Sequence, residues 1–299
     1  MSESHITTIK VEHGIVARLG AFVELLKLRL SFLVVFSSAF GYILGSSGAF
    51  QWTSLIMFCL GGFLISGSAV TLNQVYEIEY DRKMKRTRTR PLPTERVFDK
   101  EALIYAVMLA LTGILILFYF TNILTTLLSL LSLILYVFVY TPLKRVGPIA
   151  VLVGAIPGAL PPLLGWTAAT GMISHEALII FGIQFIWQFP HFWAIAWIAD
   201  EDYKKAGFKL LPGNGEKNMN TAFQIMIYTL FLIPLGLLPT VFGLTGVVSG
   251  AIATLCGVLF LAQTFRHMKN CNRNSALSIM YSSFLYLPIV QIAYLIDKV

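Results

Sequence analysis

Long, uninterrupted apolar segments dominate the chain, each near the roughly 20 residues that a helix needs to cross a hydrocarbon core about 30 Å thick. Because these segments are continuous rather than alternating, they favour helices over a membrane β-barrel. We therefore predict an all-α integral membrane protein, with a polar tail over residues 1–20 and one transmembrane domain over residues 21–299. Nine spanning helices are expected, near residues 22–45, 52–75, 101–120, 122–140, 148–168, 177–199, 220–240, 243–264 and 276–296.

Positive charge alternates sharply between the predicted loops. Of the 22 Lys and Arg residues, 21 lie in the N-terminal segment or in loops 76–100, 141–147, 200–219 and 265–275, and the last is Lys298. Basic loops remain in the cytoplasm, so we expect a cytoplasmic N-terminus, nine crossings and an outside C-terminus. Composition agrees, because 57% of residues are hydrophobic and only 12% are charged. The net charge of +7 is explained by topology and phosphate recognition, and nucleic-acid binding is not expected.

The loop between the second and third spans carries the densest charge. Asn73, Glu77 and Asp81 recur every fourth residue, so a helix continuing through them would place all three on one face. Six bases follow at once: Arg82, Lys83, Lys85, Arg86, Arg88 and Arg90. Carboxylates suit Mg²⁺, which binds them together with substrate phosphates, and guanidinium groups pair with phosphate oxygens. The stretch is explained either by a metal–diphosphate site or by a solvated basic loop that only sets topology.

The sixth span carries a second polar group of residues. It contains Trp187, Gln188, His191 and Trp193, and it ends in the acidic run Asp200–Asp202. Trp187, His191 and Asp202 lie along one helical stripe, with His191 deeper in the membrane. An intramembrane histidine is either a hydrogen-bonded packing residue or a substrate contact. The acids have the stronger case for a site, because both acidic runs emerge on the same side of the membrane.

Bases also flank two other spans on that side. Lys27 and Arg29 begin the first span, and we interpret them as headgroup anchors, with a contact to a substrate diphosphate as the alternative. Lys144 and Arg145 follow the fourth span and are open to the same two interpretations.

This layout suits a lipid diphosphate whose head lies at the membrane surface and whose tail lies in a cavity within the helix bundle. Carboxylates holding Mg²⁺, together with Lys and Arg side chains, would neutralise the charge gathering on the leaving diphosphate as an allylic carbon–oxygen bond breaks. A dry cavity would protect the allylic cation from water. Aromatic rings such as Trp187 and Trp193 could stabilise that cation.

At this point the residues resemble a known family, the UbiA-type intramembrane prenyltransferases, and within it the protoheme IX farnesyltransferase (heme O synthase) branch. The resembling strings are Asn73-x-x-x-Glu77-x-x-x-Asp81, Asp81-Arg-x-Met-x-Arg86-Thr-x-x-Arg90-Pro91, Tyr140-Thr141-x-x-Leu-Lys144-Arg145, Trp187-Gln188-x-Pro190-His191-Phe192-Trp193 and Asp202-Tyr203-x-x-Ala-Gly207. The resemblance extends over residues 25–295 or so. Glu77 departs from it, because the superfamily usually has Asp there, although a longer acid can still ligate a metal.

The resemblance implies transfer of a farnesyl group from farnesyl diphosphate to a vinyl group of heme B, with addition of water, in a bacterial inner membrane. The product would be heme O, a step toward heme A, and partners would include membrane lipid and a heme A synthase or oxidase assembly factor. Mg²⁺ would be bound by Asn73, Glu77, Asp81, Asp200 and Asp202. Diphosphate would contact Arg82, Arg86, Arg90, Lys144, Arg145 and Lys204. The heme pocket would include Trp187, Gln188, His191 and Trp193. The catalytic set would be Asn73, Glu77, Asp81, His191 and Asp202.

Three other interpretations of the sequence remain. A UbiA-type enzyme could use a quinone-type aromatic acceptor instead of heme. A transporter belongs to another class, but ion-coupled transporters usually place charged residues at mid-membrane, and here the acids cluster at one surface. A non-catalytic heme or lipid carrier would not need two acidic clusters.

Overall fold

The computed structural model describes residues 14–47 and 51–299, and within these ranges nine helices are long and apolar enough to cross a membrane. The spans are α2 (Leu28–Gly45), α3 (Trp52–Tyr76), α5 (Asp99–Phe120), α6 with its continuation (Ile123–Leu143), α8 (Ile149–Thr170), α9 (His175–Lys205), α10 (Met219–Val241), α11 (Val247–Asn270) and α12 (Arg273–Ile296). The prediction of an all-α, nine-span, multi-pass membrane protein is therefore confirmed for the described part of the chain.

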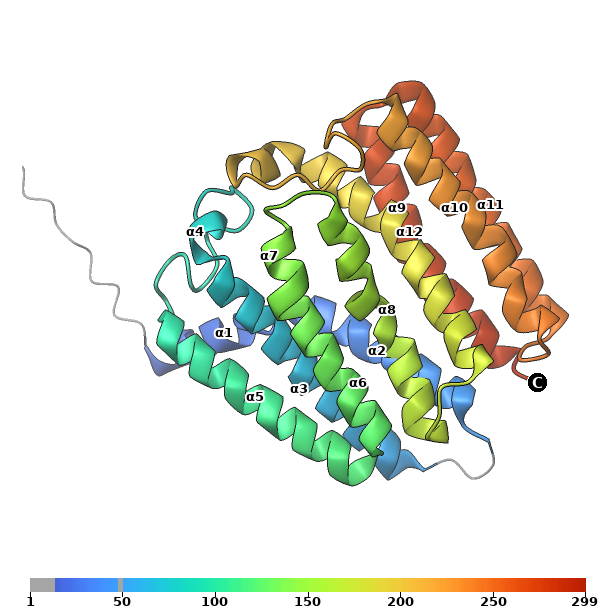
Figure 1. The fold of residues 1–299 in the computed structure, drawn as a ribbon, viewed down its shortest axis with the longest axis horizontal. Coiled ribbons are helices and arrows are strands. Elements are labelled where there is room, and N and C mark those ends of the chain that lie inside the picture. Colours follow the sequence, from blue (N-terminus) through green and yellow to red (C-terminus); the bar gives the residue numbers. More distant parts are fainter. Residues whose placement is uncertain (1–13, 48–50) are drawn as a thin grey trace, which may run out of the picture.

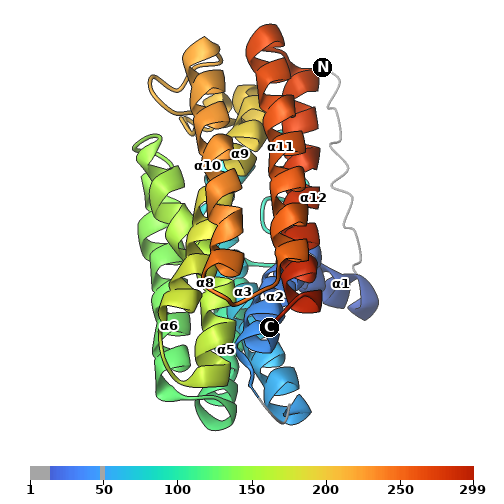
Figure 2. The same ribbon diagram turned by 90° about the vertical axis from the view of Figure 1, so that its right-hand side faces the viewer.

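The four basic loops lie at one end of the bundle, which we call the basic end (loops 76–100, 141–147, 200–219 and 265–275). Figure 1 shows this end running from α4 past α7 to the start of α10. Helix α2 packs on α8, α3 on α5, and α9 on α8, α10 and α12. Figure 2 shows α11 and α12 side by side on the flank opposite α6. The largest apolar core joins α2, α8, α9, α10, α11 and α12.

Helices α2 and α8 approach closely because glycine replaces larger residues where they cross. A Cβ atom on Gly41 would lie 1.9 Å from the carbonyl oxygen of Pro162, and one on Gly165 would lie 1.9 Å from that of Ser38. Neither position can hold a side chain without separating the helices. Despite prolines at 157, 161 and 162, α8 runs unbroken from Ile149 to Thr170. The glycines and prolines of this span therefore serve tight packing.

The predicted first span, 22–45, is wrong at its beginning. Helix α1 (Ile15–Leu25) ends and α2 begins at Leu28, with Lys27 between them in the left-handed conformation (φ 47°, ψ 57°). The freed carbonyl of Leu25 accepts hydrogen bonds from Gln74 Nε2 (2.8 Å) and from Thr71 of α3. These tertiary partners satisfy a backbone group that a continuous helix would have bonded internally. The predicted polar tail also differs: residues 14–20 largely belong to α1, and residues 1–13 lie outside the described residues.

The opposite end of the bundle is closed by the last residues of the chain. The Asp297 carboxylate accepts a hydrogen bond from the backbone nitrogen of Ser249 (2.7 Å) at the start of α11. Lys298 donates to the carbonyl oxygens of Ile43 and Ser46 at the end of α2. The acid thus caps a helix N-terminus and the lysine caps a C-terminus, in line with the charge preference of each.

Removing this cap is expected to lower stability. Asp297→Ala leaves the first turn of α11 without its side-chain acceptor and should cost about 1 kcal/mol, as N-cap losses typically do. Asp297→Asn keeps an acceptor oxygen and serves as the matched control. Thermal unfolding in detergent should show a lower midpoint for the alanine variant only, and equal midpoints for both variants would contradict the capping role.

Candidate active site

The first acidic cluster lies where α3 gives way to the short helix α4 (Ile78–Asp81). Glu77 joins the two helices with backbone angles outside the helical region (φ −105°, ψ 10°), but its nitrogen still bonds to the carbonyl of Asn73 and its carbonyl still accepts the backbone hydrogen bond of Asp81. The helical register is therefore almost kept through the junction. Asn73, Glu77 and Asp81 are all buried, with exposed fractions of 2%, 5% and 1%. Three polar side chains spaced four apart are thus enclosed at the basic end.

Each acid of this cluster faces a base, which comes from the loop after the fourth span for Glu77 and from later in the same loop for Asp81. Lys144 donates to both carboxylate oxygens of Glu77, at 2.8 and 3.1 Å. Arg90 donates to Asp81 Oδ2 at 2.7 Å, while Asp81 Oδ1 is enclosed and has no hydrogen-bond partner. Charge-assisted pairs in a poorly solvated site are strong, and a buried acceptor left without a partner is costly. Asp81 therefore retains one oxygen with binding capacity.

A π-helical turn in the fourth span brings Lys144 to Glu77. The turn covers Leu135–Tyr140, and π-helical turns are found frequently at functional sites. Thr141 follows it, donating to the carbonyl of Tyr136 (2.8 Å) and accepting from the Asn73 amide (3.1 Å). Burial works to lower the pKa of Lys144, but the Glu77 carboxylate outweighs burial and holds this pKa above its usual value. Lys144 thus stays charged beside the acidic cluster.

Lys27 also lies near this group, although its place at the start of the first span left open whether it is a headgroup anchor or a diphosphate contact. The left-handed turn before α2 leaves its side chain only half-buried near the Arg90, Lys144, Glu77 and Asp81 charges. Burial, reinforced by the positive charges of Arg90 and Lys144, lowers the pKa of Lys27 to about 7. No glycine or proline marks the helix break, so the sequence carried no local signal for this position.

The second acidic cluster stands on the last turns of α9. This helix has 31 residues and is about 46 Å long, so it extends beyond a ~30 Å hydrocarbon core at the basic end. Asp200 is buried and pairs with Lys204 (2.9 Å) and Lys217 (3.6 Å). Asp202 accepts from the backbone nitrogen of Arg86 (3.3 Å) and from Lys205.

The Asp202 contact joins the loop that follows α4 to the end of α9. The Arg86 guanidinium also donates to the Tyr203 hydroxyl (3.3 Å), one residue beyond Asp202. The loop that follows the first acidic cluster therefore contacts the second at the basic end, and both acidic runs lie at the same end of the bundle, as the alternation of loops predicted. Among the described residues, however, no three Asp, Glu, His or Cys side chains come close enough to share one ion.

Two of the predicted diphosphate contacts point elsewhere. Arg82 pairs with Glu79 (2.9 Å) and Glu95 (3.1 Å) on the exposed surface. The Arg145 guanidinium lies 4.3 Å from the centre of the Tyr80 ring and is itself exposed. Sequence position alone grouped these bases with Arg90 and Lys144, but the folded loops separate them.

The predicted heme-pocket residues of α9 do not share one face. His191 stacks on Trp187 (4.8 Å between ring centres) and hydrogen-bonds through Nδ1 to Ser283 of α12 (2.8 Å). Gln188 instead donates to the carbonyl of Ala155 on α8 (3.1 Å). Trp193 packs edge-to-face on a tyrosine of α10, and its indole nitrogen is enclosed without a partner. The string thus contacts three neighbouring helices, and only Trp187 and His191 act as a unit.

A sequence model of the UbiA prenyltransferase family matches residues 34–287. This chain belongs to the UbiA prenyltransferase family. It is 50% identical over 279 residues to a protoheme IX farnesyltransferase of Cytophaga hutchinsonii, covering 93% of this chain and 98% of that protein. It is 43% identical over 284 residues to a protoheme IX farnesyltransferase of Flavobacterium psychrophilum, covering 93% and 94%.

Solved structures share the fold of this UbiA family member at low sequence identity. A digeranylgeranylglyceryl phosphate synthase is similar with a TM-score of 0.78 and 17% identity, covering 94% of this chain and 98% of that one. A UbiA homolog from Archaeoglobus fulgidus bound to GPP and Mg²⁺ is similar with a TM-score of 0.65 and 16% identity, covering 92% and 99%. At these identities the likeness concerns the fold alone.

The donor set of this family member fits a hard cation at the first acidic cluster. Asp81 Oδ1 is enclosed and unpartnered, and the carboxylate of Glu77 and the amide oxygen of Asn73 are further oxygen donors on the same stretch. Oxygen ligands of this kind, completed by phosphate oxygens, are what Mg²⁺ prefers. Lys144 and Arg90 at present supply the positive charge that a bound cation would bring.

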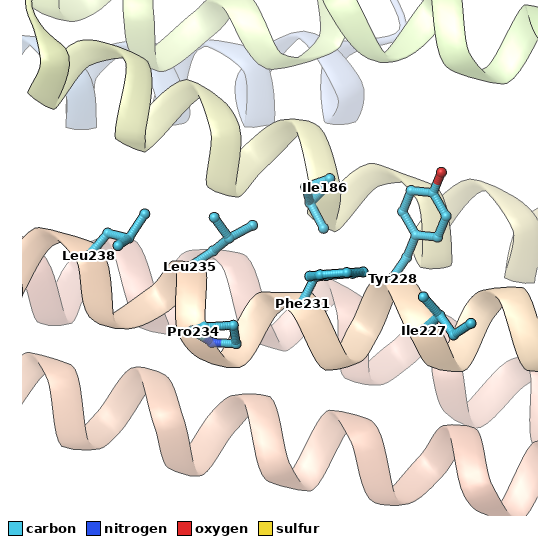
Figure 3. Close-up of a pocket in the computed structure, with 7 residues that line it drawn as sticks. All are labelled: Ile186, Ile227, Tyr228, Phe231, Pro234, Leu235 and Leu238. Carbon is cyan, nitrogen blue, oxygen red and sulfur yellow. The ribbon is translucent and has the colours of Figure 1, made fainter.

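A separate apolar pocket of about 630 Å³ lies between α9 and α10 of this UbiA family member. Figure 3 shows its lining residues: Ile186, Ile227, Tyr228, Phe231, Pro234, Leu235 and Leu238. None of these side chains carries a charge, so the pocket offers nothing to hold a diphosphate or a metal ion.

Proposed function

We propose that this protein transfers the farnesyl group of farnesyl diphosphate to a vinyl group of heme B, with addition of water, to give heme O. The observation that carries the proposal is 50% identity to a protoheme IX farnesyltransferase across 98% of that relative. The paired acids and bases at the basic end support it, because they are the groups that a metal–diphosphate head requires.

Side-chain oxygens would hold Mg²⁺, namely those of Asn73, Glu77 and Asp81 on one side and of Asp200 and Asp202 on the other. When bound, Mg²⁺ neutralises charge on the leaving diphosphate. Lys144 and Arg90, which pair with Glu77 and Asp81, would hold the nearest positive charges for the phosphate oxygens. Arg86, Lys27 and Lys204 extend this positive lining around the same end. Loss of the diphosphate is favoured because these charges are already in place before the bond breaks.

The reaction then balances without any redox change. The bond between C1 of the farnesyl group and the diphosphate oxygen breaks, and its electron pair leaves with the diphosphate. The terminal vinyl carbon bonds to farnesyl C1, and the inner vinyl carbon takes the oxygen of water, which loses a proton. Apolar packing of α2, α8, α9, α10 and α12 beneath the site would keep other water from the farnesyl cation.

On the heme side, Trp187 and His191 are the residues most suited to the acceptor. They form one stacked, hydrogen-bonded unit on α9, deeper in the membrane than the acids. His191→Ala should weaken heme binding more than diphosphate binding. Gln188 and Trp193 stay predicted heme-pocket residues, although their contacts lie toward other helices.

The proposed setting is the inner membrane of a bacterium, with the basic end and the N-terminus in the cytoplasm, following the distribution of Lys and Arg. Farnesyl diphosphate would then reach the acids from the cytoplasmic side. A heme A synthase or oxidase assembly factor is proposed as the partner that receives the product.

The decisive experiment is mass spectrometry of the product. Purified protein is incubated with heme B, farnesyl diphosphate and Mg²⁺, with an EDTA control. We expect a heme product heavier by one farnesyl group plus one hydroxyl group, absent with EDTA. If diphosphate is released with an aromatic acceptor but not with heme, the acceptor is a quinone-type molecule and not heme. If the folded protein shows neither activity, the result would favour a transporter or a carrier.

The lowered pKa of Lys27 predicts a pH dependence of diphosphate binding. Free Lys27 loses its proton above about pH 7, whereas an anionic diphosphate beside it favours the charged form, so binding takes up a proton. Affinity should therefore fall as pH rises above about 7, by up to tenfold per unit. Lys27→Arg stays charged throughout this range and should flatten the profile. Titration calorimetry across pH checks this, and parallel profiles for the two proteins would show that Lys27 does not titrate with binding.

A further inference from the structure

Ser283 of α12 makes two hydrogen bonds that together determine where the proton of His191 lies. Its Oγ is 2.6 Å from the carbonyl oxygen of Met280 and 2.8 Å from His191 Nδ1. Two oxygens at 2.6 Å are bonded only if a hydrogen lies between them, and the carbonyl has none to give. The single hydroxyl hydrogen of Ser283 therefore points to Met280.

His191 must then supply the hydrogen of the second bond. Nδ1 donates to Ser283 Oγ, so in the neutral ring Nε2 carries a lone pair. The orientation of the ring is also held, because Trp187, which stacks on it, donates from Nε1 to the carbonyl of Ser283 at 2.9 Å. One serine thus sets both the tautomer of His191 and the direction in which Nε2 points.

The Nε2 atoms of the two buried histidines, His191 and His267, differ in how far the surrounding protein encloses them. His267 also bonds through Nδ1 to a serine, but its Nε2 is fully enclosed. His191 is only 8% exposed, yet its Nε2 is not enclosed and makes no hydrogen bond among the described residues. Its ring is bordered by Trp187, Phe192 and Phe284, the last edge-on at 4.9 Å. An unpartnered nitrogen lone pair thus lies among aromatic rings without being fully enclosed.

We propose that Ser283 is a positioning residue that holds His191 with an unprotonated Nε2, and that this nitrogen binds the iron of the heme acceptor. Neutral imidazole is the commonest protein ligand of metals, and a hydrogen bond from its other nitrogen fixes the tautomer and raises its basicity. The inference rests on the proposed heme-farnesylating function.

The position of His191 along α9 suits this role. Asp202 lies eleven residues further along the helix, about 16 Å toward the basic end. Ser283 touches neither the acids nor the bases of that site, so it acts on the reaction only through His191.

The test is the absorption and electron paramagnetic resonance spectrum of ferric heme B added to the purified full-length protein. Wild type should show a histidine-ligated iron. His191→Ala should lose this signature, and added imidazole should restore it. Ser283→Ala should weaken heme affinity about 10- to 100-fold, as loss of a residue that orients a ligand typically does. Ser278→Ala removes a comparable serine of α12, which bonds only to the carbonyl of Asn274, and should behave as wild type.

Farnesyl diphosphate binding and product mass are measured in parallel to separate the outcomes. If wild type makes heme O but its spectrum equals that of His191→Ala, iron ligation is wrong while the proposed function stands. If wild type binds farnesyl diphosphate but no heme, both the acceptor and the ligation are wrong. If gel filtration shows that Ser283→Ala is unfolded, Trp187→Phe is used instead, because it removes the second bond to Ser283. This variant should weaken heme affinity without changing diphosphate affinity. Any other result would overturn the positioning role.

Discussion

Asp81→Ala and Asp202→Ala are each expected to lower prenyl transfer by roughly 10³-fold or more, because several kcal/mol of charge stabilisation would be lost. Asp81 has an enclosed oxygen without a partner, and Asp202 lies where the loop after α4 meets α9. Turnover is measured as heme O formed from heme B, farnesyl diphosphate and Mg²⁺. Near wild-type turnover in either variant would remove that residue from the metal site.

Folding must be controlled, because Asp81 is buried and paired with Arg90. Arg90 is partly exposed, so it can be solvated when its partner is lost, and Asp81→Asn keeps the shape of the side chain while removing its charge. Asp81→Asn should be as inactive as the alanine variant while eluting as folded protein. Glu79→Ala is the matched control, since this acid of the same stretch is exposed and pairs only with Arg82.

Lys144→Met is expected to have opposite effects on the two halves of the site. Without diphosphate, Lys144 neutralises Glu77 and so competes with a cation for that carboxylate. Its removal should tighten binding of Mn²⁺ alone, used as a paramagnetic substitute for Mg²⁺. With diphosphate present, a charge-assisted contact is lost, so diphosphate binding should weaken and turnover should fall by about 100-fold.

Electron paramagnetic resonance of Mn²⁺ measures the first effect, and calorimetry with a non-hydrolysable farnesyl diphosphate analogue measures the second. Lys269→Met, at the end of α11, removes an exposed base from the same end of the bundle and should change neither. If Lys144→Met weakens both metal and diphosphate binding, Lys144 supports the structure of the cluster rather than exchanging partners between Glu77 and phosphate.

Much of the fold followed from the sequence, because the bilayer leaves few choices. A hydrocarbon core demands helices of about 20 apolar residues, and loop charge then orders their ends. The helical spacing of Asn73, Glu77 and Asp81 is likewise a local property, and it survives the slight break at Glu77. These features depend on residues near one another in the chain, so periodicity alone predicted them.

The partners of these residues were decided only by tertiary structure. Lys144 reaches Glu77 because a π-helical turn and the packing of α6 direct it there, whereas Arg145 turns outward to an aromatic ring. Ser283 hydrogen-bonds to His191 although 92 positions separate them in the sequence. The apolar pattern of its span did not mark Ser283 as a functional residue.

The backbone conformation at Lys27 was likewise not predictable from the sequence. Its helix breaks because the carbonyl of Leu25 finds hydrogen-bond donors on α3, which no local propensity could predict. The direction of a side chain depends on contacts between distant segments, and those contacts exist only once the helices have packed. The sequence by itself therefore determined the number of spans and the end of the bundle at which the acids lie, whereas the packed bundle decided which bases face them.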